Sequence, residues 1–295
     1  MTTSTINVAT PSSFIERIQL FYDESSQLWE QVWGEHMHHG YYGPQGQTRA
    51  ASPQEAQRLL IEKILDWGLA TSSAPRSILD VGCGVGGSTL YLAGKYQASA
   101  TGITLSPVQA ARATTRARTA GLEKHVGFQV ADALAMPFAD DSFDLVWSLE
   151  SGEHMADKGQ FLRECCRVLR PGGRLIVATW CHRQATPPLT TSERNHLAQL
   201  YQLYHLPYVI SLADYATLGQ TLPLQDLHTA DWSEAVAPFW HDVVQSMISP
   251  QVLWGLVVPK GSDCLRPVSR FPQANGSSAI ETLGSNGGNP RCGCH

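Results

Sequence analysis

The segment from Ser77 to Ser88 constrains the fold more than any other part of the chain. It reads Ser-Ile-Leu-Asp-Val-Gly-Cys-Gly-Val-Gly-Gly-Ser, a short apolar strand followed by a glycine-rich turn. Glycine lets the backbone turn sharply and come close to a ligand, where a Cβ would obstruct it. The helix expected over 87–95 directs its positive end toward that ligand. The segment therefore predicts an α/β domain that binds a small charged cofactor at this turn.

The glycine spacing alone fits two kinds of cofactor site. The pattern G-x-G-x-x-G beginning at Gly82 also matches a dinucleotide fingerprint, which requires an acidic residue about twenty positions later. Here the strand expected over 98–103 is followed by Thr-Leu-Ser, without a carboxylate. A third strand ends in Asp132, where a carboxylate can accept a hydrogen bond from an adenine amino group. With the strands expected over 142–148 and 169–175, this succession resembles the class I S-adenosylmethionine-dependent methyltransferases, and another Rossmann-type nucleotide binder is the alternative.

Strands and helices alternate from 77 to 180, which is the pattern of a parallel sheet with right-handed crossovers. An amphipathic helix is expected from Phe14 onward, and a second over 52–67 has Ser52 as its N-cap. Further helices are expected over 106–120 and 157–169. Beyond residue 183, Ser192 is expected to cap a helix and Asp214 to begin another. The range 224–231 is expected to form a sixth strand, and 238–247 a further helix.

Five longer motifs are uncommon enough to be specific. They are FYDESS at 21–26, WGEHMHHGYY at 33–42, GITLSPVQ at 102–109, WSLESGEHM at 147–155 and TWCHR at 179–183. Together they resemble the γ-tocopherol methyltransferase family of class I S-adenosylmethionine-dependent methyltransferases, over roughly residues 14–248. The resemblance implies a Rossmann-like α/β sheet with helices on both faces and a helical cap. It also implies methyl transfer from S-adenosylmethionine to a ring carbon of γ- or δ-tocopherol in vitamin E biosynthesis.

This organisation divides the chain into three parts. Residues 1–12 are expected to be a disordered N-terminus, and residues 13–250 the methyltransferase domain, with its core at 77–183 and its cap at 184–248. The remaining residues, 251–295, are an atypical tail rich in Gly, Ser, Pro and Asn, a composition typical of disorder. The closing helix and strand of the family are not recognisable there. We therefore expect the C-terminal strand to be missing or replaced, which leaves edge groups of the fifth and sixth strands unpaired.

The resemblance also assigns the donor site. It places Asp80, Gly82 and Gly84 at the methionyl part of the donor. The remaining expected contacts are Thr104, Leu105 and Gln109 at the ribose, Asp132 and Ala133 at the adenine, and Tyr22 and Tyr41 in an N-terminal lid. Aromatic faces attract a sulfonium by about 0.5–2 kcal/mol. The alternative readings are that Asp80 only accepts turn amides and that the two tyrosines are core aromatics.

Methylation of a phenol ring requires a base, because the ordinary phenol pKa near 10 keeps the proton in place at neutral pH. Glu153 and His154 follow a strand end on the side of the sheet where such folds bind ligands, and they are the leading catalytic candidates. His182, after the fifth strand, is the alternative base. Each of the three could instead cap a helix or support its neighbours.

Two short motifs contain residue types that bind metal ions, one with histidines only and one with cysteines and a histidine. His36-x-His38-His39 places alternate imidazoles on one face, and Cys292-Gly-Cys294-His295 ends the chain. Neither has a coherent set of further ligands. We predict no metal, and expect the first motif to form a pocket wall.

The acceptor is expected to be a small lipophilic phenol held by the cap. Plausible lining residues are Tyr201, Leu203, Tyr204, Leu206, Pro207, Tyr208, Val209, Leu212, Tyr215, Phe239 and Trp240. Such a substrate lies in a membrane, so transient contact with the membrane surface is expected. Alternatives are a prenylquinol or alkaloid nitrogen as acceptor, an inactive cofactor-binding homologue, and a cyclopropane synthase.

Bulk properties exclude several other classes. The net charge of −5 provides no basic surface for nucleic acid, and no stretch approaches the roughly 18 apolar residues of a membrane span. No protein partner is implied. The N-terminus lacks the features of a signal or transit peptide, and the seven cysteines show no disulfide framework. Since the resemblance implies plastid proteins in plants, these features indicate a mature or a bacterial form, and we predict a cytoplasmic protein of bacterial type.

Overall fold

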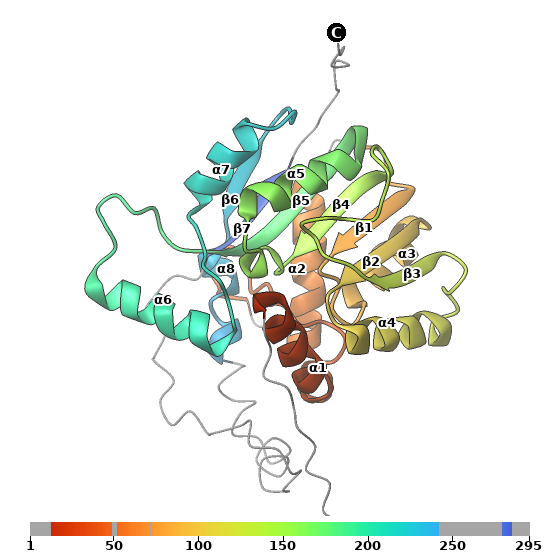
Figure 1. Ribbon diagram of the computed structural model, residues 1–295, viewed down its shortest axis with the longest axis horizontal. Helices are drawn as coiled ribbons and strands as arrows, with labels where there is room; N and C mark the ends of the chain where they lie inside the picture. Colours follow the sequence, from red (N-terminus) through yellow and green to blue (C-terminus); the bar gives the residue numbers. More distant parts are fainter. Residues whose placement is uncertain (1–12, 49–51, 71, 242–278, 285–295) are drawn as a thin grey trace, which may run out of the picture.

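The computed structural model describes residues 13–48, 52–70, 72–241 and 279–284. Within these residues, seven strands form a single sheet (Figure 1). The strands are β1 Ser77–Val81, β2 Ser99–Thr104, β3 Val126–Val130, β4 Phe143–Leu149, β5 Leu169–Cys181, β6 His228–Asp231 and β7 Ala279–Gly284. Their order is β3-β2-β1-β4-β5-β7-β6, with β1 to β5 parallel and β7 antiparallel to both of its neighbours. This confirms the predicted Rossmann-like α/β sheet.

Helices cover both faces of the sheet (Figure 1). They are α1 Phe14–Trp33, α2 Pro53–Gly68, α3 Gly87–Tyr96, α4 Pro107–Thr119, α5 Lys158–Val168, α6 Thr191–Leu203, α7 Leu212–Gln220 and α8 Ser233–Val236, with a short 3₁₀ helix η1 at Gly152–His154. Alternate residues of β1 face opposite ways. Ile78 packs in the core with α2 and α3, whereas Leu79 packs in the core with α5 and α7.

Helix α1 is held across the carboxyl edge of the sheet by polar contacts with α4. Glu30 accepts hydrogen bonds from Arg112 and Arg116, at 2.7 Å from Arg116 Nη2. Asp23 accepts a hydrogen bond from the hydroxyl of Ser106, which is also the N-cap of α4. These contacts bring the N-terminal helix to the edge of the sheet at which parallel α/β folds bind ligands.

The expectation of a missing C-terminal strand is wrong. Strand β7, at Ala279–Gly284, lies between β5 and β6 and pairs with both. Six residues inside a Gly- and Ser-rich segment give too weak a local signal to be recognised. The backbone groups of two flanking strands provide the partner that stabilises such a strand. The closing strand therefore lies within the range predicted to be a disordered tail. The other residues of that range, 251–278 and 285–295, lie outside the described residues.

Smaller differences concern helix starts and strand ends. The N-cap of helix α6 is Thr190, two residues before the predicted cap Ser192, because Thr190 and Glu193 form a capping box. Helix α7 likewise has Ser211 as its N-cap, paired with Asp214 at the third position. Strand β3 ends at Val130, before Asp132. The helix expected over 238–247 lies largely outside the described residues.

Candidate functional site

The glycine turn between β1 and α3 forms the floor of one cavity. Gly82 and Gly84 have φ angles of +82° and +51°, which favour glycine. A Cβ at Gly82 would lie 2.2 Å from the Cβ of Ser151, whereas a Cβ at Gly84 would meet nothing within 4 Å. The backbone is thus packed closely on one side of the turn. At Gly84 it leaves open space in which a ligand can approach the start of α3.

Asp80 lies at the end of β1, buried beside this turn. Its side chain is 2% exposed, and Thr89 Oγ1 in α3 donates a hydrogen bond of 2.6 Å to its Oδ2. Burial raises the pKa of Asp80 to about 7, although the hydrogen bonds from Thr89 act in the opposite direction. A cationic ligand would stabilise the ionised form of this buried carboxyl group, because a nearby positive charge favours ionisation.

The far wall of the same cavity comes from the end of β2 and the start of α4. Thr104 Oγ1 donates a hydrogen bond of 2.7 Å to Gln109 Oε1, which orients the amide group of Gln109. Leu105 lies between them in sequence and also lines the cavity. The cavity has an empty volume of about 850 Å³. It brings together seven of the expected donor contacts, namely Tyr22, Asp80, Gly82, Gly84, Thr104, Leu105 and Gln109.

Three other expected donor contacts do not line this cavity. Asp132 Oδ1 accepts a hydrogen bond of 2.9 Å from the backbone N–H of Leu134, so its carboxylate closes its own turn. Ala133 is buried in the core on the α5 side of the sheet. Tyr41 packs against Trp232, with ring centroids 6.0 Å apart. The structure therefore does not bring these residues to the cavity at the glycine turn.

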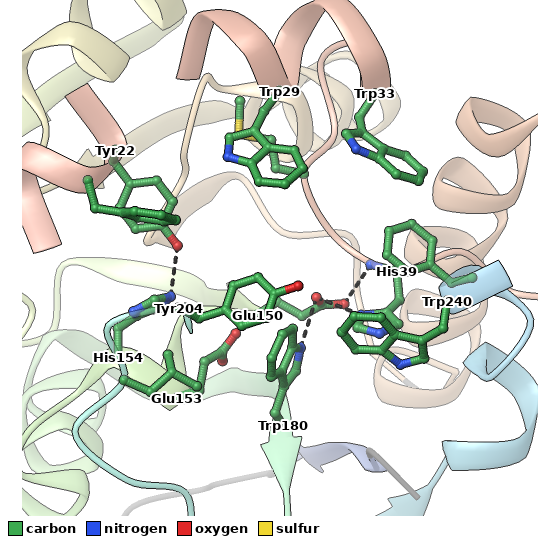
Figure 2. Close-up of a pocket in the computed structure, with 14 residues that line it drawn as sticks. Tyr22, Trp29, Trp33, His39, Glu150, Glu153, His154, Trp180, Tyr204 and Trp240 are labelled. Carbon is green, nitrogen blue, oxygen red and sulfur yellow. Dashed lines mark hydrogen bonds and ion pairs between the residues drawn. The ribbon is translucent and has the colours of Figure 1, made fainter. Parts of the chain in front are cut away.

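A second cavity, largely aromatic, shares lining residues with the first, and Figure 2 shows the side chains of this second cavity. Its empty volume is about 730 Å³. Its walls come from α1, from the ends of β4 and β5, and from the segments after α6 and α8. The lining residues are Phe21, Tyr22, Trp29, Trp33, Met37, His39, Glu150, Glu153, His154, Trp180, Tyr204, Leu206, Phe239 and Trp240. Such a wall suits a flat, apolar ligand with a small polar group.

The two cavities share Tyr22, Met37, Glu150 and His154. The hydroxyl of Tyr22 in α1 is 2.7 Å from Nε2 of His154 in η1, and Figure 2 shows the two side chains meeting across the cavity. Burial, together with the charges of Glu153 and Glu150, raises the pKa of Tyr22 far above its ordinary range. Burial and the charge of Lys158 lower the pKa of His154 to about 3. Both groups are thus neutral near pH 7.

Glu150 is the centre of a hydrogen-bond network in the aromatic cavity. It has a positive φ of 51° directly after β4. Its carboxylate accepts hydrogen bonds of 2.8 Å from both the backbone N–H and Nδ1 of His39, and one of 3.1 Å from Nε1 of Trp180. Burial acts to raise the pKa of Glu150, but the charge and hydrogen bonds of His39 outweigh it and lower the pKa below its ordinary value. Glu150 is therefore ionised at neutral pH.

The pKa of Glu153 is shifted in the opposite direction to that of Glu150. Its side chain is 3% exposed, and Thr179 Oγ1 donates a hydrogen bond of 2.8 Å to Oε2. Burial and the nearby charge of Glu150 raise the pKa of Glu153 to about 7. Two neighbouring carboxyl groups with pKa values pushed apart are a common arrangement for acid–base chemistry. Near pH 7, Glu153 can both accept and release a proton.

His182, the alternative base, lies away from both cavities. Its Nδ1 is 2.7 Å from the backbone carbonyl oxygen of Arg183, and its backbone forms a bridge with Ser211. The expected role of His182 as a base is therefore not supported by its position. Of the three catalytic candidates, only Glu153 and His154 line the aromatic cavity.

The histidines of the WGEHMHHGYY motif line the cavities from the loop after α1. His36 and His38 face the cavity at the glycine turn, and His39 faces the aromatic one. Among the residues that the structure describes, no group of three or more His, Cys, Asp and Glu side chains could hold a metal ion.

Sequence reasoning missed several residues of the aromatic cavity. Of the eleven cap residues expected to line it, Tyr204, Leu206, Phe239 and Trp240 do so. It missed Trp29, Trp33, Met37 and Trp180 as lining residues, whereas His39 belongs to the motif expected to form a pocket wall. A signal for two of them was present, because Tyr22, Trp29 and Trp33 are spaced seven and four apart and so share one face of α1.

Comparisons with known proteins agree with this geometry. Residues 79–177 match the family model described as a methyltransferase domain. Over 253 residues the chain is 48% identical to a probable chloroplastic tocopherol O-methyltransferase of Oryza sativa subsp. japonica, covering 84% of this chain and 70% of the relative. It is 47% identical to the chloroplastic tocopherol O-methyltransferase of Arabidopsis thaliana, covering 78% and 68%.

A solved structure shows the same fold. It is a geranyl diphosphate methyltransferase in complex with GPP and sinefungin, 21% identical, with a TM-score of 0.73 over 93% of this chain and 99% of that one.

Proposed function

Because this chain belongs to the tocopherol O-methyltransferase family of S-adenosylmethionine-dependent enzymes, we propose that it methylates an aromatic ring carbon of γ- or δ-tocopherol. The reaction is a step of vitamin E biosynthesis. The observation that carries the proposal is the pair of adjoining cavities, one at the glycine turn and one aromatic, which share the Tyr22–His154 contact.

The first cavity fits S-adenosylmethionine in shape and in charge. The open space at Gly84 admits the donor to the start of α3, and the buried carboxyl of Asp80 is placed to pair with its ammonium group. Thr104, Leu105 and Gln109 provide an edge suited to a ribose. When bound, S-adenosylmethionine supplies a methyl group on a positively charged sulfur. The protein's task is then to orient donor and acceptor, which can lower a barrier by up to about 7–11 kcal/mol.

In the second cavity, Glu153 is our proposed base for the acceptor hydroxyl. A base is most effective when its pKa lies near the working pH, and the pKa of Glu153 is raised to about 7. Removal of the phenol proton increases the electron density of the ring. The aromatic side chains exclude water from it, and the negative charge of Glu150 keeps the carboxyl of Glu153 basic.

The Tyr22–His154 contact is our proposed clamp between the two cavities. Tyr22 reaches from α1 over both cavities, so its hydrogen bond to His154 fixes the helix above the reactants. The hydroxyl and the imidazole are neutral near pH 7, and neither adds a charge beside the sulfonium.

Tyr22→Phe and His154→Ala are expected to lower kcat while donor affinity stays within about twofold. Loss of one net hydrogen bond of about 0.5–1.5 kcal/mol predicts a roughly 2- to 13-fold fall for Tyr22→Phe. The two effects should be less than additive, because both variants remove the same contact. Steady-state kinetics and donor titration of the single and double variants measure this. His182→Ala, away from both cavities, is the control with unchanged turnover, and fully additive losses would contradict the clamp.

The acceptor is tested by incubating the enzyme with labelled S-adenosylmethionine and γ-tocopherol in lipid vesicles. The expected product is the ring-methylated tocopherol, identified by mass spectrometry and NMR. A methyl ether would place the transfer on oxygen instead of carbon. Transfer to a prenylquinol or an amine alkaloid, with no reaction of tocopherol, would assign another acceptor. Binding of S-adenosylhomocysteine without turnover of any acceptor would indicate an inactive homologue.

We propose that the enzyme meets its lipophilic substrate at a membrane surface. No helix within the described ranges is both long and apolar enough to cross a bilayer. The large exposed apolar side chains include Ile15 and Leu20 on α1 and Tyr208 in the cap, the two elements that supply much of the aromatic cavity. Sedimentation of the enzyme with the vesicles of the same assay should retain part of it, and none in the pellet would exclude the contact.

The predicted cytoplasmic, bacterial-type location is wrong. Both plant relatives at 47–48% identity are chloroplastic enzymes, which points to a protein that acts in a plastid. Composition and the residues at the N-terminus were not sufficient grounds for the earlier expectation.

A further inference from the structure

Lys158 is buried beneath the turn that carries Glu153 and His154. Its side chain is 2% exposed, at the start of α5. Its Nζ donates hydrogen bonds of 2.9 Å to the carbonyl oxygens of Gly152 and Glu153, and one of 2.7 Å to that of Met155. The ammonium group therefore spans η1 and the residue that follows it.

The number of contacts requires the charged form of Lys158. An ammonium has three N–H donors and a neutral amine has two, so three carbonyl acceptors are satisfied together only by the ammonium. Carbonyl groups at a helix end carry partial negative charge, which stabilises a cation there. Burial lowers the pKa of Lys158 to about 8, while the charges of Glu153 and Cys181 act to raise it. The side chain is thus mainly charged at pH 7.

The same ammonium contacts the cap. The ring of Tyr208, in the segment between α6 and α7, has its centroid 4.7 Å from Nζ of Lys158. The hydroxyl of Tyr215 in α7 donates a 3.5 Å hydrogen bond to the carbonyl oxygen of Gly152, one of the acceptors of the lysine. Lys158 thus lies between the cap and the turn.

The charge of Lys158 also acts on both side chains of the turn. It lowers the pKa of His154, on which burial has the larger effect. It also lowers the pKa of Glu153, on which burial, the charge of Glu150 and the hydrogen bonds from the backbone and from Thr179 all have larger effects. The titratable groups that face this region are Tyr22 in α1, Glu150 after β4, Cys181 in β5, His205 and Tyr208 in the cap, and Tyr215 in α7. Lys158 is the cation whose charge acts on both Glu153 and His154.

We propose that Lys158 is a positioning residue for methyl transfer, whose ammonium fixes the turn Gly152–Met155 and so holds Glu153 and His154 at the acceptor cavity. The proposal rests on the proposed function of these two side chains. It assigns to Lys158 no contact with donor or acceptor, because Lys158 lines neither cavity.

The test compares Lys158→Met, Lys158→Arg and the exposed control Lys63→Met. For Lys158→Met we expect kcat with γ-tocopherol to fall about 10–100-fold, since a small displacement of reacting groups has effects of this size. The affinity for S-adenosylmethionine should stay within about twofold. The acid limb of the pH–kcat profile should move to higher pH, because the charge that lowers the pKa of Glu153 is gone. Lys158→Arg should return this limb to its wild-type position and recover part of kcat.

Amide hydrogen exchange over 152–157 provides a readout that does not depend on the acceptor. Exchange should be faster in Lys158→Met than in the wild type or in Lys63→Met. If Lys158→Met does not fold, Tyr208→Leu replaces it, with faster exchange over the same residues and a two- to fivefold lower kcat expected. Wild-type exchange, or a lower kcat without movement of the acid limb, would overturn the positioning role. A wild-type enzyme that methylates no tocopherol would instead overturn the proposed function and leave the exchange result to be judged separately.

Discussion

Replacing Asp80 by alanine is expected to weaken the binding of S-adenosylmethionine by about 30-fold or more. The carboxyl group is buried at the end of β1, and its described side-chain hydrogen-bond donor is Thr89. Removing one partner of a buried charged pair costs about 2–5 kcal/mol, which corresponds to roughly 30- to several-thousand-fold in affinity. Asp80→Asn keeps the shape of the side chain and should lose nearly as much, since it removes the charge. Isothermal calorimetry measures both variants.

The pH dependence of donor binding provides a second signature of Asp80. The pKa of the free carboxyl is about 7, and pairing with an ammonium lowers it. Binding should therefore release about half a proton at pH 7, and affinity should fall as the pH drops below 7. Calorimetry in buffers of different ionisation enthalpy detects this release. Asp66→Asn, an exposed carboxylate on α2, is the control, and unchanged donor affinity in Asp80→Ala would remove Asp80 from the donor site.

Glu153→Gln is expected to give the largest loss of turnover with an intact donor site. A positioned base contributes typically about 10²–10⁴ in rate, and the amide cannot accept the phenol proton. In the wild type, kcat should fall as the pH drops below about 7, because the carboxyl of Glu153 becomes protonated there. This limb should be absent in the variant, whose donor affinity should match the wild type.

Single-turnover kinetics between pH 5.5 and 9 separate the chemical step from product release. Glu123→Gln, on the surface, serves as the matched control. A Glu153→Gln enzyme with wild-type rate and an unchanged acid limb would assign the base to another group that lines the same cavity, such as His154.

The same substitution should stabilise the folded protein at alkaline pH. The pKa of Glu153 is raised in the folded state, so the folded protein binds more protons than the unfolded chain between about pH 4.5 and 7. Stability contributed by this group therefore falls as the pH rises through that range. The neutral amide of Glu153→Gln avoids this loss. A higher unfolding temperature at pH 8, together with a lower kcat, would be the expected exchange of activity for stability.

The sequence predicted the parts of the fold that depend on local patterns. The glycine turn, the parallel strands and the helices of the core appear as expected, since apolar periodicity and capping residues specify them within a few positions. The proposed donor contacts at Asp80, Gly82 and Gly84 follow from the same turn. Asp132 shows the limit of this reasoning, because a carboxylate after a strand can close its own turn as readily as it can contact a ligand.

The sequence by itself determined that this chain forms an α/β methyltransferase fold with a carboxylate beside a glycine turn after its first strand. The tertiary structure decided the rest of the chemistry. Tyr22 and His154 are 132 positions apart, and His39 and Glu150 are 111 apart, so no local pattern indicates that they meet. Which of Glu150 and Glu153 holds a proton near pH 7 depends on burial and on neighbouring charges, and both arise only when the distant segments pack together.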